Sequence, residues 1–166
     1  MIPAVAFILI FGSMIAESRG SARNERALRT AGAVEPRGDV YAAMQFAYPG
    51  TFLAMFAEAV LRDVTTWSTA ATVGVAVFVA AKALKYWAIG TLGVRWTFRV
   101  LVPPDSPRIV AGPYRWIRHP NYVAVAGELA GAALWLRAPI AGPFSLLIFG
   151  ALMLRRIHVE EEALAR

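Results

Sequence analysis

A short polar stretch, residues 112–119, stands directly before an apolar segment in which Glu128 is the only charged residue. Arg118 and His119 end this stretch, and Pro120 suits the first position of a helix. The start of a helix exposes backbone N–H groups and the positive end of the helix dipole. Such a place binds a carboxylate or a phosphate. A capped helix start whose arginines touch lipid headgroups is the equally good alternative.

The C-terminal stretch RRIHVEEEALAR supplies charges of the opposite sign. Arg156 and Glu160 are four residues apart and therefore lie on one face of a helix. Glu160 and Glu161 have the chemistry to hold an ammonium group or the two hydroxyls of a ribose, although an internal ion pair on a solvated helix is the alternative. Three aromatic residues lie in or directly after the first stretch: Tyr114, Trp116 and Tyr122. Together these groups favour a zwitterionic, nucleoside-like ligand.

The elements that position these residues are predicted to be membrane helices. The chain has 166 residues and is 58% hydrophobic, with a mean hydropathy of +0.52. Its apolar residues fall in blocks, and about 20 residues of helix cross a bilayer. We predict an all-α integral membrane protein in which residues 1–166 form one membrane domain. The five predicted transmembrane helices cover residues 2–16, 41–61, 67–90, 121–136 and 140–154.

The connections between these helices divide the domain into two parts. Residues 1–90 hold the first three helices, with residues 23–30 expected as a separate helix on the membrane surface. Residues 91–166 hold a proline-rich polar loop, the last two helices and a polar tail. We expect the loop before the fourth helix and the C-terminal tail to form a cytoplasmic cofactor site together.

The positive charges are distributed unevenly along the chain. Of the 17 Lys and Arg residues, all but Arg62 and Arg137 fall on the side of the long loop and the C-terminal tail. The positive-inside rule therefore puts the N-terminus outside and the C-terminus in the cytoplasm. The same rule explains the net charge of +6 without nucleic-acid binding. The absence of cysteine excludes thiolate catalysis, and two histidines are too few for a typical metal site.

The motif GPYRWIRHPNY, followed after an apolar hairpin by RIHVEEEAL, resembles the isoprenylcysteine carboxyl methyltransferase (ICMT) family of integral-membrane methyltransferases. The wider group includes phospholipid methyltransferases. The match covers residues 82–164. The stretches RNERALRTAGAVE and ALKYWAIGTLGVRW are similar to a bacterial subgroup paired with type III polyketide synthases. That subgroup is implied to O-methylate alkylpyrones or alkylresorcinols, which places the chain in a bacterial cytoplasmic membrane with a functional link to such a synthase.

The resemblance implies S-adenosylmethionine as the methyl donor. The acceptor is implied to be a lipophilic small molecule that enters from the bilayer, with membrane lipids around the protein. The resemblance also implies which residues line the cofactor site: Arg108, Ile109, Tyr114, His119, Pro120, Asn121, Tyr122 and Glu160.

Three residues are candidates for catalytic roles: Arg156, Glu160 and Glu128. The resemblance implies that Arg156 faces the acceptor, where its fork of donors would orient the acceptor oxygen. A pyrone enol arrives ionised and needs no base, whereas a resorcinol needs one, with His119 and Glu160 as alternatives. Glu128 is an intramembrane carboxylate and so a functional-site hypothesis by default. It either pairs with Lys85 or Lys82 or contacts the polar head of the substrate.

Several alternatives stay open from the sequence. In one alternative, the enzyme methylates the carboxylate of a prenylcysteine or the amine of a phospholipid. In another, the protein is a non-catalytic membrane scaffold. Glu58, near the outer end of the second helix, is either interfacial or a helix-packing contact.

Overall fold

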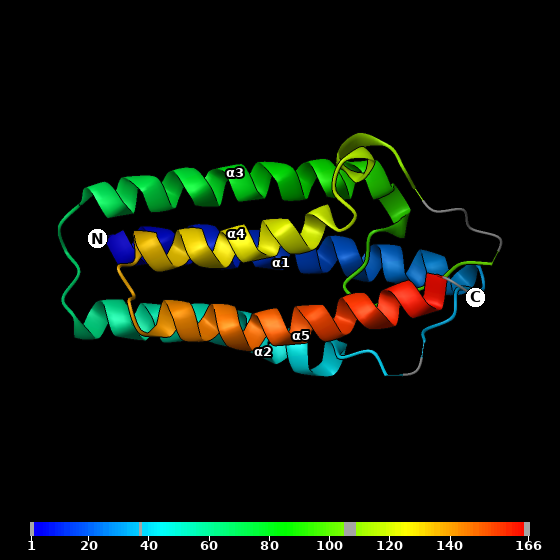
Figure 1. Ribbon diagram of the computed structural model, residues 1–166, viewed down its shortest axis with the longest axis horizontal. Helices are drawn as coiled ribbons and strands as arrows, with labels where there is room; N and C mark the ends of the chain where they lie inside the picture. The colour runs from blue at the N-terminus through cyan, green and yellow to red at the C-terminus, as the bar shows by residue number, and fades with distance from the viewer. Residues whose placement is uncertain (1, 37, 105–108, 165–166) are drawn as a thin grey trace.

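The computed structural model describes residues 2–36, 38–104 and 109–164 and shows a bundle of helices (Figure 1). Its α-helices are α1 (Ile2–Thr30), α2 (Tyr41–Leu61), α3 (Thr69–Leu92), α4 (Pro120–Trp135) and α5 (Ala141–Leu164). Two short 3-10 helices, Gly93–Arg95 and Gly112–Arg115, lie in the connection between α3 and α4. Within the described residues there is no strand, only an isolated pairing of Val34 with Val102. The predicted all-α class is confirmed.

Three of these helices, α1, α3 and α5, are long and apolar enough to cross a membrane. Helix α4 has 16 residues, fewer than the roughly 20 that a perpendicular crossing needs. Helix α2 matches its predicted range of residues 41–61, and the start of α3 is shifted to Thr69 because Ser68 caps it. The side chain of Ser68 accepts a hydrogen bond from the Ala71 N–H.

The expected separate surface helix over residues 23–30 is wrong, because α1 continues without a break to Thr30. The stretch after Ala16 contains no proline and is rich in Ala, Arg and Glu, which are strong helix formers. The C-terminal tail likewise extends α5 as one helix to Leu164. Where the sequence of these helices becomes polar, the backbone therefore stays helical and only the surroundings of the side chains differ.

Both helix extensions lie at the same end of the bundle. The C-terminus, the end of α1 and the start of α4 are together there, and the N-terminus lies at the opposite end (Figure 1). We call the end that is formed by the ends of α1, α3 and α5 and by the starts of α2 and α4 the polar end. At the polar end, the α3–α4 connection lies next to the C-terminal part of α5, as we expected from the order of the helices.

The opposite end is fastened by Glu58, which accepts hydrogen bonds from the backbone N–H groups of Ile140 and Ala141 at 3.2 Å and 2.6 Å. These groups belong to the start of α5, where a helix lacks its own acceptors. Arg62 pairs with the same carboxylate at 2.8 Å. Glu58 is therefore a helix-packing contact, one of the two readings that the sequence left open.

The closest packing in the bundle joins α3 and α4 through glycine. A Cβ atom added to Gly74 would lie 2.3 Å from the Trp135 backbone nitrogen and 2.7 Å from the Gly131 carbonyl oxygen. Backbone atoms cannot give way as flexible side chains do, so these glycines fix the distance between the two helices. The pair then holds the start of α4 in place at the polar end.

We predict that Gly74→Ala destabilises the protein by about 1–3 kcal/mol, because the added methyl group forces the two backbones apart. Gly90→Ala in the same helix is the matched control, since nothing lies within 4 Å of a Cβ there. It should be neutral or stabilising by up to about 1 kcal/mol through helix propensity. Thermal unfolding in detergent measures both, and equal effects would contradict the packing argument.

Candidate functional site

A cavity of about 470 Å³ opens at the polar end of the bundle. It is lined by α1, α2, the end of α3, the start of α4, α5 and the connecting residues 95–102. Its volume lies within the range of small-molecule sites. Six of the residues predicted for the site line this cavity: Tyr114, His119, Asn121, Tyr122, Arg156 and Glu160.

The hydroxyl of Tyr122 joins the two sequence stretches from which the site was predicted. It donates a hydrogen bond to Glu160 at 2.8 Å and accepts one from Arg156 Nε at 3.0 Å. His119 Nε2 lies 3.1 Å from a carboxylate oxygen of Glu161. Arg156 and Glu160 are thus connected through a tyrosine from α4, so the start of α4 and the end of α5 form one polar surface.

The start of α4 differs in detail from a capped helix. His119 occupies the cap position, but its side chain makes no capping hydrogen bond. The N–H groups of Tyr122 and Val123 bond to the His119 carbonyl at 3.1 Å and 3.3 Å. Pro120 has no N–H, so the first N–H of the helix belongs to Asn121. Asn121 lines the cavity, and its side-chain oxygen is buried without a hydrogen-bond partner.

Three of the described residues that were predicted for the site do not line the cavity. Pro120 is buried behind its rim, and Glu128 is fully buried deeper in the bundle. Ile109 is described but is not among the lining residues. Arg108 lies outside the described residues.

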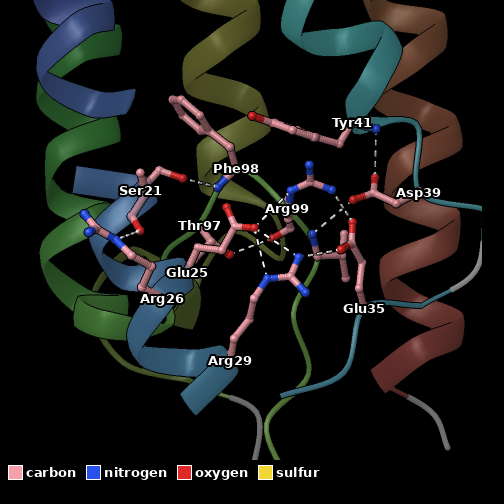
Figure 2. Close-up of polar contacts among 12 residues, drawn as sticks. Ser21, Glu25, Arg26, Arg29, Glu35, Asp39, Tyr41, Thr97, Phe98 and Arg99 are labelled. Carbon is pink, nitrogen blue, oxygen red and sulfur yellow. Dashed lines mark hydrogen bonds and ion pairs between the residues drawn. The ribbon is translucent and has the colours of Figure 1, made fainter. Parts of the chain in front are cut away.

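A wall segment, residues 96–102, closes the cavity on the side of α1 (Figure 2). The Phe98 N–H donates to the Ser21 hydroxyl at 2.7 Å, and the Val100 N–H donates to Asp39 at 3.1 Å. Val102 exchanges two backbone hydrogen bonds of 3.0 Å with Val34. The segment has no regular structure of its own and is held in place by the N-terminal part of the chain.

Arg99 is the centre of the charged network that anchors this wall segment (Figure 2). It pairs with Glu25 at 3.0 Å and with Glu35 at 2.7 Å, and its guanidinium lies 4.5 Å from the centre of the Tyr41 ring. Arg29 also pairs with Glu35, at 2.7 Å. Burial alone would raise the pKa of Glu35, but the hydrogen bonds from Arg29 and Arg99 outweigh it and hold this pKa below its ordinary value.

A cluster of four charges lies at the inner end of the cavity, which two of them, Glu17 and Lys85, line. Lys85 Nζ lies 2.7 Å from Glu17 and 3.3 Å from Glu128. Lys82 Nζ lies 2.6 Å from Glu17 and 3.3 Å from Glu128. The Tyr48 hydroxyl donates a hydrogen bond to Glu128. The predicted ion pair of Glu128 with Lys85 or Lys82 is confirmed, and it involves both lysines.

Arg156 is held from several directions. Its guanidinium donates to the Phe98 carbonyl oxygen, lies 3.4 Å from Asp39 and binds the Tyr122 hydroxyl. Asp39 also accepts a hydrogen bond from the Tyr41 N–H at 3.1 Å. The side chain of Arg156 is buried, with an exposed fraction of 7%, so its direction is fixed before any ligand arrives.

Sequence reasoning missed the contributions of Glu17, Asp39, Tyr48 and the wall segment. Glu17 carried a usable signal, because a carboxylate in a continuous apolar helix needs a partner as Glu128 does. It was missed because the first helix was expected to end at residue 16. Asp39 and the wall segment gave no such signal, since their sequence resembles an ordinary polar connection.

Tyr114 lines the cavity, and the pKa of its phenol is raised. Burial, and secondarily the negative charge of Glu160, raise the pKa of its phenol. Its hydroxyl therefore remains protonated at neutral pH and can donate a hydrogen bond to a ligand.

The fold and the site define a class of protein: apolar helices of membrane-spanning length around an amphipathic cavity with charged groups at one end. The chain belongs to the isoprenylcysteine carboxyl methyltransferase (ICMT) family, whose model matches residues 73–166. This family and the apolar helices together indicate an integral membrane methyltransferase.

Two bacterial proteins are similar over most of the chain. The uncharacterized protein YpbQ of Bacillus subtilis is 29% identical over 90% of this chain and 88% of its own length. An uncharacterized protein of Haemophilus influenzae is 27% identical over 87% of this chain and 84% of its own length. No solved structure matches the chain.

The charge cluster gives a first prediction for the site. Lys85→Met should destabilise the protein by about 3–5 kcal/mol, because it leaves two buried carboxylates with one ammonium. Glu17→Gln should also destabilise it. The double variant should cost less than the sum of the two by about 1–3 kcal/mol, since it restores a neutral Lys82–Glu128 pair. Thermal unfolding in detergent tests this, and strict additivity would refute the coupling.

The charged network that anchors the wall segment gives a second prediction. A carboxyl group with a lowered pKa in the folded protein stabilises the fold above its ordinary pKa, and this contribution is lost as the pH falls through the lowered value. Glu35→Gln should therefore lower the melting temperature at about pH 7, and this difference should shrink as the pH falls through the lowered pKa of Glu35. A difference that persists below that pKa would show that Glu35 acts without its charge.

Proposed function

We propose that the protein is an S-adenosylmethionine-dependent methyltransferase that O-methylates a long-chain polyketide of the alkylpyrone or alkylresorcinol type. The observation that carries this proposal is the composition of the cavity. The family-matched part contributes charged and hydrogen-bonding residues such as Arg156 and Glu160, and α1 and α2 contribute apolar side chains such as Met14, Ile15 and Met44. Such a cavity suits a polar cofactor next to a lipophilic acceptor.

The residues at the polar end fit this cofactor. Glu160 supplies a carboxylate for an ammonium group or for ribose hydroxyls, and the start of α4 favours a carboxylate. The buried Asn121 oxygen lacks a partner and would accept a hydrogen bond from an amino or hydroxyl group. Tyr114 and His119 would complete the lining beside the nucleoside. The cofactor supplies an activated methyl group on a sulfonium.

The protein residues then have positioning as their main task, because the methyl donor is already activated. Arg156 would orient the acceptor oxygen, and its fixed partners Asp39, Phe98 and Tyr122 keep its fork of donors in one direction. A pyrone enol arrives without its proton. For a resorcinol, His119 or Glu160 would take the proton from the acceptor oxygen, and the contact of His119 with Glu161 would hold that imidazole in place.

The setting of the reaction follows from the helices. We propose that all five helices lie in a bacterial cytoplasmic membrane, α2 and α4 among them, with the polar end and the C-terminus in the cytoplasm. The excess of Lys and Arg in the segments at this end supports the orientation. The acceptor would then arrive from the bilayer, and a type III polyketide synthase on the cytoplasmic side would supply it.

Binding of S-adenosylhomocysteine tests the cofactor part of the proposal. Titration calorimetry on the purified protein should detect binding. Glu160→Gln should raise the Kd about tenfold or more, since a hydrogen bond to a charged group contributes about 1.5–3 kcal/mol. Glu162→Gln is the matched control, because Glu162 is exposed and pairs with His158 on the same helix. Equal effects of the two variants, or no binding by the native protein, would contradict the proposal.

Transfer of a labelled methyl group tests the acceptor. Long-chain alkylpyrones and alkylresorcinols should be methylated more efficiently than a prenylcysteine or a phosphatidylethanolamine. Preference for the prenylcysteine carboxylate or the phospholipid amine would support the methyltransferase activity but contradict the proposed acceptor. A protein that binds the cofactor product but modifies none of these acceptors would refute the polyketide assignment.

A further inference from the structure

One side of the cavity is built by α1 and α2, which precede the family-matched residues 73–166. The lining residues from these two helices include apolar, hydroxyl and amide side chains: Met14, Ile15, Ser18, Met44, Gln45 and Tyr48. The matched part of the chain therefore provides the polar end of the cavity, whereas this side depends on sequence outside the family pattern.

The cavity reaches the surface between these two helices. Ile15 lines the cavity and is nevertheless 50% exposed. Ser18 and, from the facing helix, Gln45 also line the cavity and are exposed. Residues that both line a cavity and reach the surface mark its opening. We call this place, defined by Ile15, Ser18 and Gln45, the side opening.

The side opening is bounded by contacts above and below. Towards the N-terminal end, α1 and α2 pack against each other, with the rings of Phe7 and Phe56 5.3 Å apart. Towards the polar end, Phe98 of the wall segment is held against α1 by its hydrogen bond to Ser21. The helices diverge between these two contacts, and α2 starts away from α1 (Figure 1). The side opening is therefore a gap limited at both ends by contacts, and α1 and α2 are not separated along their whole length.

The surface around the side opening is apolar. Ile8 and Leu9 on α1 are 69% and 55% exposed, and Phe46 and Leu53 on α2 are 74% and 50% exposed. Helix α1 is also one of the helices long and apolar enough to cross a membrane. A gap in such a surface opens towards hydrocarbon and admits an alkyl chain more readily than a charged group.

The inner end of the cavity offers the opposite chemistry. Tyr48 comes from α2 itself, and Lys85 Nζ lies 5.4 Å from the centre of its ring. Both residues line the cavity. The Lys85 ammonium group already faces three carboxylate oxygens, one of Glu17 and both of Glu128, so its donors are engaged within the cluster. The acceptor oxygen would instead reach the guanidinium of Arg156, which lines the same cavity.

We propose that the side opening between α1 and α2 is the binding site for the alkyl chain of the methyl acceptor, whose oxygen-bearing head lies inside the cavity near Arg156. The occupant is an amphiphile with a single alkyl chain and a compact head. This inference rests on the proposed function for the identity of the acceptor. The geometry of the opening itself comes from α1 and α2.

The absence of cysteine from the chain allows a direct test. Ile15→Cys places a thiol in the side opening, and Ile8→Cys is its matched control. Ile8 lies seven residues earlier, two turns away on the same face of α1, and does not line the cavity. Gln45→Cys and Phe46→Cys form the corresponding pair on α2. Each variant is purified in detergent and labelled with N-ethylmaleimide, with S-adenosylhomocysteine binding measured in parallel.

A long-chain alkylresorcinol at about ten times its Kd should slow labelling at positions 15 and 45 about tenfold, in proportion to the occupied fraction. Labelling at positions 8 and 46 should not change. Orcinol, which has the same head and only a methyl group, should leave all four rates unchanged. Equal protection of all four positions would mean that the lipid only dissolves in the detergent belt, and it would overturn the proposal.

The two hypotheses fail in different ways. Protection at positions 15 and 45 without any binding of S-adenosylhomocysteine would support the side opening and refute the methyltransferase. Binding of S-adenosylhomocysteine without protection at these positions would support the methyltransferase and refute the side opening.

Discussion

Mutual neutralisation of two lysines and two glutamates inside the bundle is the constraint on which the rest of the structure depends. An unpaired charge among apolar helices is costly, so Glu17, Lys82, Lys85 and Glu128 must meet. They come from α1, α3 and α4, and Tyr48 adds α2 through its hydrogen bond to Glu128. The cluster thereby fixes the rotation of four helices about their axes and their positions along the bundle. Packing of interchangeable apolar side chains alone would not fix either.

The height of this cluster sets the depth of the cavity. Residues at the rim and at the inner end are seven positions apart on each of four helices, a rise of about 10 Å. These pairs are Tyr41 and Tyr48, Leu92 and Lys85, Asn121 and Glu128, and Arg156 and Phe149. A slip of one helix by a turn would break the ion pairs and misplace a rim residue together. The stability of the core and the geometry of the site therefore have the same cause.

Sequence alone predicted the parts of the fold that carry a local signal. Pro120 marked the start of α4, and apolar length marked α2. The spacing of Arg156 and Glu160 put both on one helix face, and in the structure both bind the Tyr122 hydroxyl. The end of the first helix was misplaced because a change from apolar to polar residues was read as a change of backbone. The wall segment was not predicted, because its position depends on distant partners such as Ser21 and Asp39.

Residues of the family motif and residues outside it both contribute to the site, and this bears on how acceptors are selected. Arg156 belongs to the family motif, yet its guanidinium is aimed by Asp39 and by the Phe98 carbonyl, which lie outside that motif. Asp39 in turn depends on the start of α2, and Phe98 depends on α1. A motif residue whose direction is set by segments outside the motif can serve different acceptors without changing its identity. Substrate class should therefore follow from α1, α2 and the wall segment and not from the motif that defines the family.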